Sequence, residues 1–487
     1  MAKTLQQETA AKAIAELAKL GGQLTAEEDI LFQGTKIILP EGTTLRENWQ
    51  FLKAKEQEDE QDTFFERRYK YRPWDGARAT YNALKKAFGA VIQRGTPGFF
   101  GDNPPTMITI PVSATETEQI PQDRVIVPHL PGVSLYLGEE RDRELGPLFH
   151  LQVSGPRKFR HAIEGIFRLI EEELKTNSLY RGKAFDGQVQ PEFLDLRGVS
   201  PKKVVYAEQT MIDLEANVWS LLRYSEQMES LGVPLKRAVL LEGPYGTGKT
   251  LAANLTAQIA TQNGWSFVMC RPGRDKLRDV MATARLYQPS VVFFEDVDTV
   301  ADVESRNVSE LLDIFDGIQA KGTKIMCILT TNHVDRIHKG MCRPGRLDAI
   351  IHIGALDAAG IRKLIEVTVK PEMLSEGLGW SEIAAAMEGY VPAFCAEAIQ
   401  RAVRYNLSRN AGKPSRLETK DFVAAAKGLR EQFNIMSGAK ENFEVDPLSL
   451  ALGRVVHDVV HGTSVVDADG DEMYTLDMVG ANGNGSH

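Results

Sequence analysis

Gly243-Pro-Tyr-Gly-Thr-Gly-Lys-Thr250 is the stretch that decides the fold, because it carries the spacing GxxxxGK[ST]. The apolar run Ala238-Val-Leu-Leu241 precedes it, and Leu251, Leu255 and Ile259 follow at the spacing of one helix face. Between a strand and a helix, glycines let the backbone curl so that successive N–H groups point inward at phosphate oxygens. A structural glycine turn is the alternative, and the flanking strand and helix disfavour it. The stretch predicts a P-loop that binds the phosphates of a nucleoside triphosphate.

The residues of this loop have separate expected roles. Lys249 neutralises the terminal phosphates, and the Thr250 hydroxyl is a ligand of Mg²⁺. The residues expected to contact the nucleotide here are Gly243, Pro244, Tyr245, Gly246, Thr247, Gly248, Lys249, Thr250 and Leu251.

A second acidic motif lies about forty residues further along. The apolar run Val291-Val-Phe-Phe294 ends in Glu295-Asp-Val-Asp298, which reads as a Walker B element. At the carboxyl end of a buried parallel strand, the first acid can support the magnesium ion and the second can deprotonate the attacking water. We therefore expect Glu295 to help hold the metal ion and Asp296 to be the general base. Solvated charges after a strand are the alternative.

The pattern around these motifs indicates an α/β fold with a parallel sheet covered on both faces. Between residues 236 and 355, short apolar runs alternate with helical patterns, whereas residues 357–434 read as helices only. The expected strands are 238–241, 266–269, 291–294, 325–329 and 349–353, and the expected lid helices are 358–369, 381–387, 393–407 and 420–433.

Two further segments make a family resemblance specific. Ile328-Leu-Thr-Thr-Asn332-His333 and Met341-Cys-Arg343-Pro-Gly-Arg346-Leu-Asp348 resemble the sensor 1 and arginine-finger segments of the AAA ATPases, over roughly residues 204–430. The resemblance implies ATP and Mg²⁺ as cofactors and an AAA+ core with a helical lid. It also implies that Asn332 polarises the water or the γ-phosphate. Arg343 and Arg346 would complete a neighbouring subunit's site in a homohexameric ring. Without the family resemblance, both arginines could be read as surface charges.

The sequence departs from the family pattern in three places. The Glu295-Asp296 order resembles the subgroup that contains the mitochondrial inner-membrane folded-protein translocase, and Asp296 is one methylene shorter than the usual base. The loop Arg271–Lys276 lacks the aromatic residue with which threading members grip unfolded chains. The lid turn 389–393 resembles the small-residue turn of the AAA-proper clade and carries no arginine, so no sensor 2 arginine is expected. From spacing alone, we expect residues 205–207, including Ala207, and Ala393 to share the adenine contact.

The rest of the chain is expected to form separate parts. These are a mainly helical segment 1–95, a small α/β domain 97–180 for partner binding, a linker 181–203, the large ATPase subdomain 204–355, the lid 356–434 and a partly disordered tail 435–487. Residues 66–94 contain eight basic and two acidic residues with interleaved aromatics, which suits nucleic acid or, with greater weight, a solvated or protein-docking face.

Composition sets the remaining limits. A chain of 487 residues exceeds one compact core, and the net charge of −9 argues against a surface made wholly for nucleic acid. Four dispersed cysteines, no signal-peptide pattern and no apolar span predict a soluble, cytoplasmic protein without membrane contact. His457 with His461, and Asp467 to Glu472, depart from zinc and calcium motifs, so neither is expected to bind metal.

These expectations combine into one functional hypothesis with two alternatives. The chain is expected to be an AAA ATPase whose ring remodels or disassembles a macromolecular client, most simply a protein, in the manner of a chaperone. A nucleic-acid motor or loader that uses residues 66–94 is one alternative. A nucleotide-gated scaffold with slow turnover is the other.

Overall fold

A computed structural model gives the structure of the chain. It describes residues 50, 53–54, 57–95, 97–98, 101–198, 200–201, 204–271, 274–297, 323–334, 337, 340, 343, 346–413, 415–437, 465–466 and 472–474. Several expected features lie outside these residues. They are the helix over residues 10–20, Asp298, the two histidines 457 and 461, and most of the tail.

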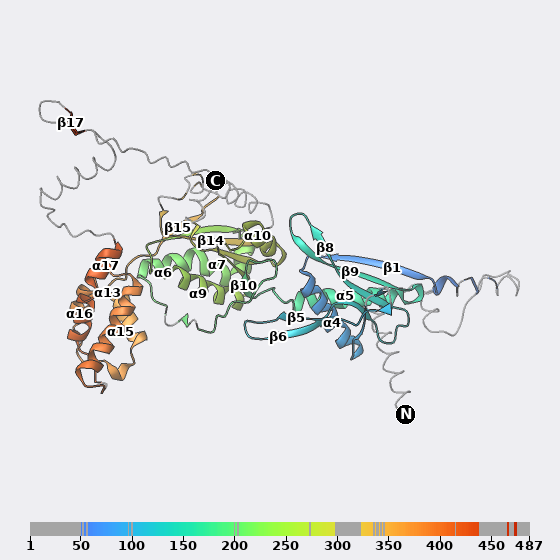
Figure 1. The fold of residues 1–487 in the computed structure, drawn as a ribbon, viewed down its shortest axis with the longest axis horizontal. Coiled ribbons are helices and arrows are strands. Elements are labelled where there is room, and N and C mark those ends of the chain that lie inside the picture. Colours follow the sequence, from blue (N-terminus) through green and yellow to red (C-terminus); the bar gives the residue numbers. More distant parts are fainter. Residues whose placement is uncertain are drawn as a thin grey trace, which may run out of the picture.

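The ATPase region is built on a six-stranded sheet in which every neighbouring pair of strands is parallel (Figure 1). In spatial order the strands are β10 (Ala184–Asp186), β12 (Ser266–Cys270), β13 (Ser290–Phe294), β14 (Ile325–Thr331), β11 (Arg237–Glu242) and β15 (Ala349–His352). The five expected strands are therefore confirmed. The sixth, β10, falls in the segment expected to be a linker, and its three residues are all buried.

Helices cover both faces of this sheet, because alternate strand residues point to opposite sides. Val291 and Phe293 belong to one apolar cluster with the alanines of α9 (Lys249–Gln262), whereas Val292 and Phe294 belong to another with α10 (Leu277–Leu286). The α9 side also carries α6 (Glu208–Leu214), a π-helical turn (Glu215–Trp219), α7 (Ser220–Arg223) and α8 (Ser225–Ser230). The parallel α/β core predicted from the apolar runs is thus observed.

A helical lid follows the sheet. It consists of α13 (Ala358–Thr368), α14 (Trp380–Ala386), α15 (Pro392–Arg409), α16 (Thr419–Lys427) and α17 (Arg430–Ser437). Asp357 caps α13, since its Oδ1 accepts the Gly360 N–H at 2.6 Å. The last expected helix, 420–433, is in fact two helices that separate around Gly428.

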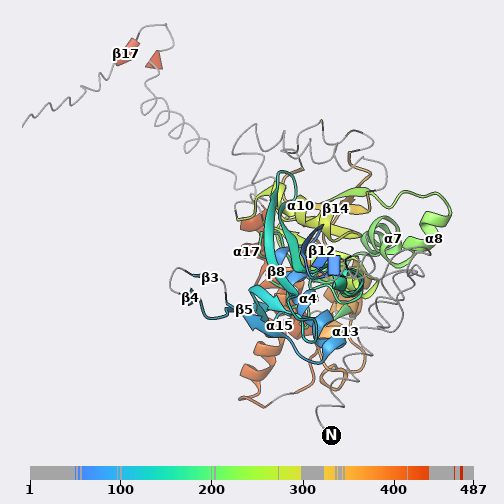
Figure 2. The same cartoon turned by 90° about the vertical axis from the view of Figure 1, so that its right-hand side faces the viewer.

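The N-terminal domain contains an antiparallel sheet with two helices against it. The strands, in spatial order, are β1 (Asp62–Tyr69), β9 (Gly146–Pro156), β8 (Ser134–Asp142), β7 (Asp123–Ile126) and β2 (Ile92–Arg94), and the helices are α4 (Pro73–Phe88) and α5 (Arg160–Thr176). A hairpin, β5 (Met107–Pro111) and β6 (Thr117–Pro121), adjoins α4. The short pair β3 (Pro97–Gly98) and β4 (Gly101–Asp102) projects beyond it (Figure 2).

Residues 62–69 differ from the expected helical segment. They form β1, which pairs with β9 over its whole length, so the sheet crosses the division expected at residue 95. The side chains of this strand alternate between exposed and partly buried until Tyr69, which is buried. The charged residues Glu66, Arg67 and Arg68 obscured that period of two in the sequence.

A buried polar cluster joins the N-terminal domain to the ATPase region. Arg72, 1% exposed, donates from Nη2 to Thr283 Oγ1 at 2.5 Å, and its backbone N–H donates to the Tyr287 hydroxyl at 3.1 Å. The Tyr287 ring packs edge-on against Tyr180, with 5.4 Å between centroids. Burial raises the pKa of the neighbouring Asp75 to about 6. The two parts therefore share a core.

None of the described helices contains the apolar window of 18 residues that a helix crossing a membrane needs.

Candidate active site

The loop between β11 and α9 has the conformation of a phosphate cradle. Gly243, with φ of 155°, approaches the sheet so closely that a Cβ there would lie 2.0 Å from the Ile353 carbonyl oxygen. Gly248, with φ of 100°, precedes the first turn of α9. Its carbonyl accepts the Tyr206 hydroxyl at 2.8 Å, and burial raises the pKa of Tyr206, so this hydroxyl remains a donor.

Lys249 points back into this loop. Its side chain is buried, and Nζ donates to the carbonyl oxygens of Gly243 at 2.6 Å and Pro244 at 2.9 Å. A phosphate group in the cradle would offer the ammonium an anionic acceptor, and hydrogen bonds between charged groups are about twice as strong as neutral ones. The geometry therefore fits the predicted role of Lys249.

Thr250 and Glu295 bring together the oxygen atoms that a magnesium site requires. The Thr250 hydroxyl donates to Glu295 Oε1 at 3.1 Å, and Arg271 Nε lies 4.0 Å from Glu295 Oε2. Mg²⁺ takes oxygen ligands and usually retains several waters, so one carboxylate and one hydroxyl beside bound phosphates are a suitable donor set. These two residues fit the metal role expected of them.

Asp296 points away from Glu295 toward the next strand. Its backbone has φ of 43°, a left-handed conformation that aspartate tolerates better than most residues. Its N–H donates to Thr330 Oγ1 at 2.9 Å, and its Oδ1 accepts Asn332 Nδ2 at 2.9 Å. The two adjacent acids therefore face different partners, as their separate roles require.

Lys249, Thr250, Asp296 and Asn332 line one cavity of about 470 Å³ between the P-loop and the lid. Four of the predicted site residues, Gly243, Pro244, Thr247 and Glu295, are not part of its lining. Its lining is Val205, Tyr245, Gly246, Gly248, Lys249, Thr250, Leu251, Asp296, Thr330, Asn332, Leu364, Pro392, Ala393 and Ala396. The lid closes it at one end, where the Ala393 N–H donates to the Gly246 carbonyl at 3.1 Å.

The predicted adenine residues are placed unequally. Val205 and Ala393 line the cavity, whereas Ala207 lies at the start of α6 and is not part of the lining. Leu364 and Ala396, which sequence reasoning missed, supply apolar surface from α13 and α15. Their helical spacing looked like ordinary lid packing, so no signal in the sequence separated them from core residues.

The two predicted arginine fingers lie outside this cavity. Arg343 is exposed, and Arg346 donates from Nη1 to the Gly340 carbonyl at 3.1 Å. Neither residue lines the site of its own chain. Their role at a neighbouring subunit remains a prediction.

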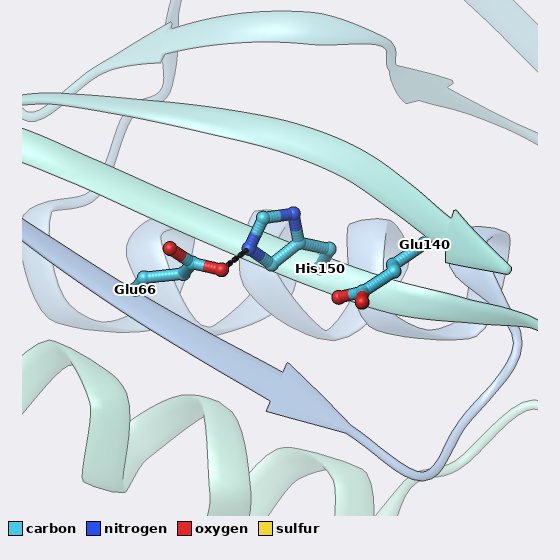
Figure 3. A group of neighbouring side chains, drawn as sticks. All are labelled: Glu66, Glu140 and His150. Carbon is cyan, nitrogen blue, oxygen red and sulfur yellow. Dashed lines mark ion pairs between the residues drawn. The ribbon is translucent and has the colours of Figure 1, made fainter. Parts of the chain in front are cut away.

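A group of potential metal ligands lies on the N-terminal sheet, far along the sequence from the cavity residues. Glu66, Glu140 and His150 converge there, with ligand atoms within 4.8 Å of one another (Figure 3). Arg68 pairs with both acids, through Nε with Glu140 Oε2 at 2.6 Å and through Nη2 with Glu66 Oε1 at 3.6 Å. His150 Nε2 also lies 2.8 Å from Glu66 Oε1. Because both acids already have basic partners, we interpret the group as an ion-pair network.

A strand, a P-loop, a helix and polar residues at the ends of two adjacent strands define a P-loop nucleoside triphosphatase fold. The comparison with protein families makes this more specific. Residues 239–355 match the ATPase family associated with various cellular activities (AAA). Residues 239–355 therefore form a domain of the AAA ATPase family.

Curated relatives are similar to part of the chain. The cell division cycle protein 48 homolog of Archaeoglobus fulgidus is 32% identical over 202 residues, which are 38% of this chain and 27% of the relative. The proteasome-activating nucleotidase of Methanocaldococcus jannaschii is 28% identical over 262 residues, 48% of this chain and 58% of the relative. The ATP-dependent zinc metalloprotease FtsH of Lactococcus lactis is 29% identical over 232 residues, which are 44% of this chain and 32% of the relative. The matched region is thus less than two thirds of each relative.

Proposed function

We propose that this protein hydrolyses ATP with Mg²⁺ and uses the cycle to remodel a protein client within a homohexameric ring. One observation carries the proposal: a hydrogen-bonded acid and amide, Asp296 and Asn332, line the same cavity as the P-loop residues Lys249 and Thr250. Hydrolysis needs a base and a positioning group opposite the residues that hold the phosphates.

The chain's own residues divide the chemistry between them. Lys249 and the loop amides hold the phosphates, and Asp296 takes the proton from the attacking water. Asn332 fixes the orientation of Asp296 through the 2.9 Å hydrogen bond. In the reaction, Asn332 polarises the water or the γ-phosphate. Thr250 and Glu295 would hold Mg²⁺, which supplies positive charge to the phosphate oxygens.

The position of the arginines supports a ring. Arg343 is exposed, and both arginines lie outside the cavity of their own chain. If they act on a nucleotide, that nucleotide must be bound by an adjacent subunit. A guanidinium supplied in trans stabilises transition-state charge and makes hydrolysis depend on the interface. Head-to-tail interfaces that close produce rings.

A protein client is favoured over nucleic acid by the charges of residues 66–94. Arg67 pairs with Glu171, Arg68 pairs with Glu140 and Lys86 pairs with Glu173. These cations come from β1 and from α4, and carboxylates neutralise them within the domain. The stretch therefore offers less free positive charge for a phosphate backbone than its composition suggests.

The loop after β12 favours work on folded partners rather than threading. Asp275 accepts the Arg271 N–H at 2.8 Å, and Arg274 pairs with the buried Asp186 of β10 at 3.0 Å. The Arg274–Asp186 ion pair thus connects the loop to β10 at the edge of the sheet, and the sequence of the loop contains no aromatic residue. A loop held in this way is poorly suited to gripping an extended chain.

Affinity capture tests the proposed client. Asp296→Asn should hold ATP without hydrolysing it, whereas Lys249→Ala should not hold the nucleotide. We expect a protein that is enriched with the Asp296→Asn chain in ATP and absent from the Lys249→Ala capture. Purified client should then stimulate phosphate release by the wild-type chain. Capture of nucleic acid alone would favour the motor, and ATP-dependent assembly without turnover would favour the scaffold.

A further inference from the structure

A second large cleft lies between the N-terminal domain and the ATPase region. Its volume is about 730 Å³, larger than that of the P-loop cavity, and the two share no lining residue. Residues of α4 and the segment after α5 form one side, and Thr261 and Gly264, at the end of α9, form the other.

The lining of this cleft is strongly basic. It contains five cations, Arg78, Lys85, Lys86, Arg181 and Lys183, and one carboxylate, Glu173. Lys86 pairs with Glu173, and Arg78 pairs with Glu118 at 2.7 Å. Within the described part of the chain, Lys85, Arg181 and Lys183 have no ion pair with a carboxylate. The cleft therefore retains about three uncompensated positive charges.

An apolar extension continues from the basic cleft. A cavity of about 350 Å³ shares Val112, Gly182, Lys183 and Thr261 with it and adds three larger apolar side chains. These are Phe193, Leu194 and Leu196. One face of the Phe193 ring packs on Tyr180, with centroids 5.5 Å apart and an angle of 18° between the planes. Lys183 thus stands where the charged and apolar parts meet.

We propose that this cleft binds a free nucleotide, independently of the P-loop. The phosphates lie against Lys85 and Lys183, since ammonium groups are compact charges that suit phosphate oxygens. The base occupies the apolar extension beside Phe193. Both volumes fall within the usual range of small-ligand sites. A nucleic-acid strand would need successive aromatic platforms, and Phe193 is the one aromatic residue in the described lining.

The location gives such a ligand a structural consequence. The 14 residues of α9 begin at the P-loop lysine, Lys249, and end at Gln262 beside the cleft, a span of about 20 Å. A nucleotide in the cleft would contact α4 of the N-terminal domain and the last turn of α9 together. It would therefore stabilise the docked arrangement of the two parts.

Equilibrium binding of ADP by full-length variants tests the proposal without any need for hydrolysis. In a Lys249→Ala background, which removes the P-loop cation, titration calorimetry should still detect one site per chain. Adding Lys85→Gln and Lys183→Gln should weaken that site at least tenfold. Adding Lys370→Gln and Lys427→Gln, two exposed lid lysines, is the matched control and should leave the affinity unchanged.

Competition experiments identify the ligand class. Inorganic tripolyphosphate should displace ADP from the Lys249→Ala chain but bind more weakly than ADP, because it cannot fill the apolar extension. The proposal is overturned if ADP binding vanishes with Lys249→Ala alone, or if the two cleft substitutions leave it unchanged. It is also overturned if a thymidine 12-mer binds this cleft and tripolyphosphate does not compete. Failure of the ATPase assay would leave this binding result unaffected.

Discussion

Asn332 donates its side-chain amide to Asp296 Oδ1 at 2.9 Å and so joins the carboxyl ends of β14 and β13. The two strands are neighbours and parallel, with Phe294 opposite Leu329, so their following residues emerge at the same edge of the sheet. Thr330 holds the backbone N–H of Asp296 at 2.9 Å. These contacts hold the base in a left-handed backbone conformation and orient its carboxylate.

Replacing Asp296 by Asn should slow hydrolysis without loss of nucleotide binding. Asparagine also tolerates the left-handed conformation but cannot accept the proton, and general-base catalysis contributes about 10²–10⁴-fold. We expect phosphate release to fall at least about 100-fold while ATP affinity changes little. Asp123→Asn is the control, since Asp123 also has a positive φ, 71°, but lies in the N-terminal domain. Equal turnover of the Asp296→Asn and Asp123→Asn chains would show that Asp296 is not the general base.

Replacing Gly243 by Ala should disrupt the phosphate cradle. The added Cβ would lie 2.0 Å from the Ile353 carbonyl oxygen, so the P-loop or the residue that follows β15 must move. We expect ATP affinity, measured by calorimetry, to fall at least about tenfold. Gly377→Ala is the control because Gly377 also has a positive φ, 82°. No atom outside Gly377 and its two chain neighbours lies within 4 Å of the position that its Cβ would take. Unchanged ATP affinity in the Gly243→Ala chain would show that the observed loop is not the binding conformation.

Mixing two inactive chains tests whether the arginines act across an interface. Chains with Arg343→Ala and Arg346→Ala should bind ATP but hydrolyse it at least about 10³-fold more slowly, the usual effect of losing an arginine finger. Chains with Asp296→Asn retain both arginines. Mixed rings should therefore contain some complete sites and regain part of the activity. Arg362→Ala, on the exposed side of α13, should have little effect alone. No activity in mixtures that do form rings would argue against a role in trans.

The sequence predicted the parts of this protein whose chemistry is local. The P-loop, the acids after Phe294 and the apolar strands could be recognised because each depends on a short run of residues with a fixed period or spacing. The strand β1 could not, because Glu66, Arg67 and Arg68 hide its alternation. Thr330, Leu364 and Ala396 reach the cavity only through the packing of strands and lid helices. Such long-range contacts leave no trace in a single sequence.

The Asp75 carboxyl should make the stability of the chain fall as pH rises from about 4 to 6. Asp75 belongs to α4 and is buried against the segment after α5, where it accepts the Ser178 hydroxyl at 2.7 Å and the Leu179 N–H at 2.8 Å. Burial raises its pKa from 3.8 to about 6, although these bonds, Tyr287 and the nearby Arg78 act in the opposite direction. The folded chain thus binds more protons than the unfolded chain in this window, and stability declines with pH.

The size of this effect follows from the shift of about two pKa units. Each unit corresponds to about 1.4 kcal/mol, so the folded state should lose about 3 kcal/mol between about pH 3 and pH 7 from this group. Asp75→Asn should remove that loss, because asparagine does not ionise, whereas Asp62→Asn at the exposed start of β1 should retain it. Urea unfolding followed by intrinsic fluorescence at several pH values measures the difference between the two variants. If Asp75→Asn and Asp62→Asn show the same pH profile, the buried carboxyl does not control the stability of the junction between the N-terminal domain and α10.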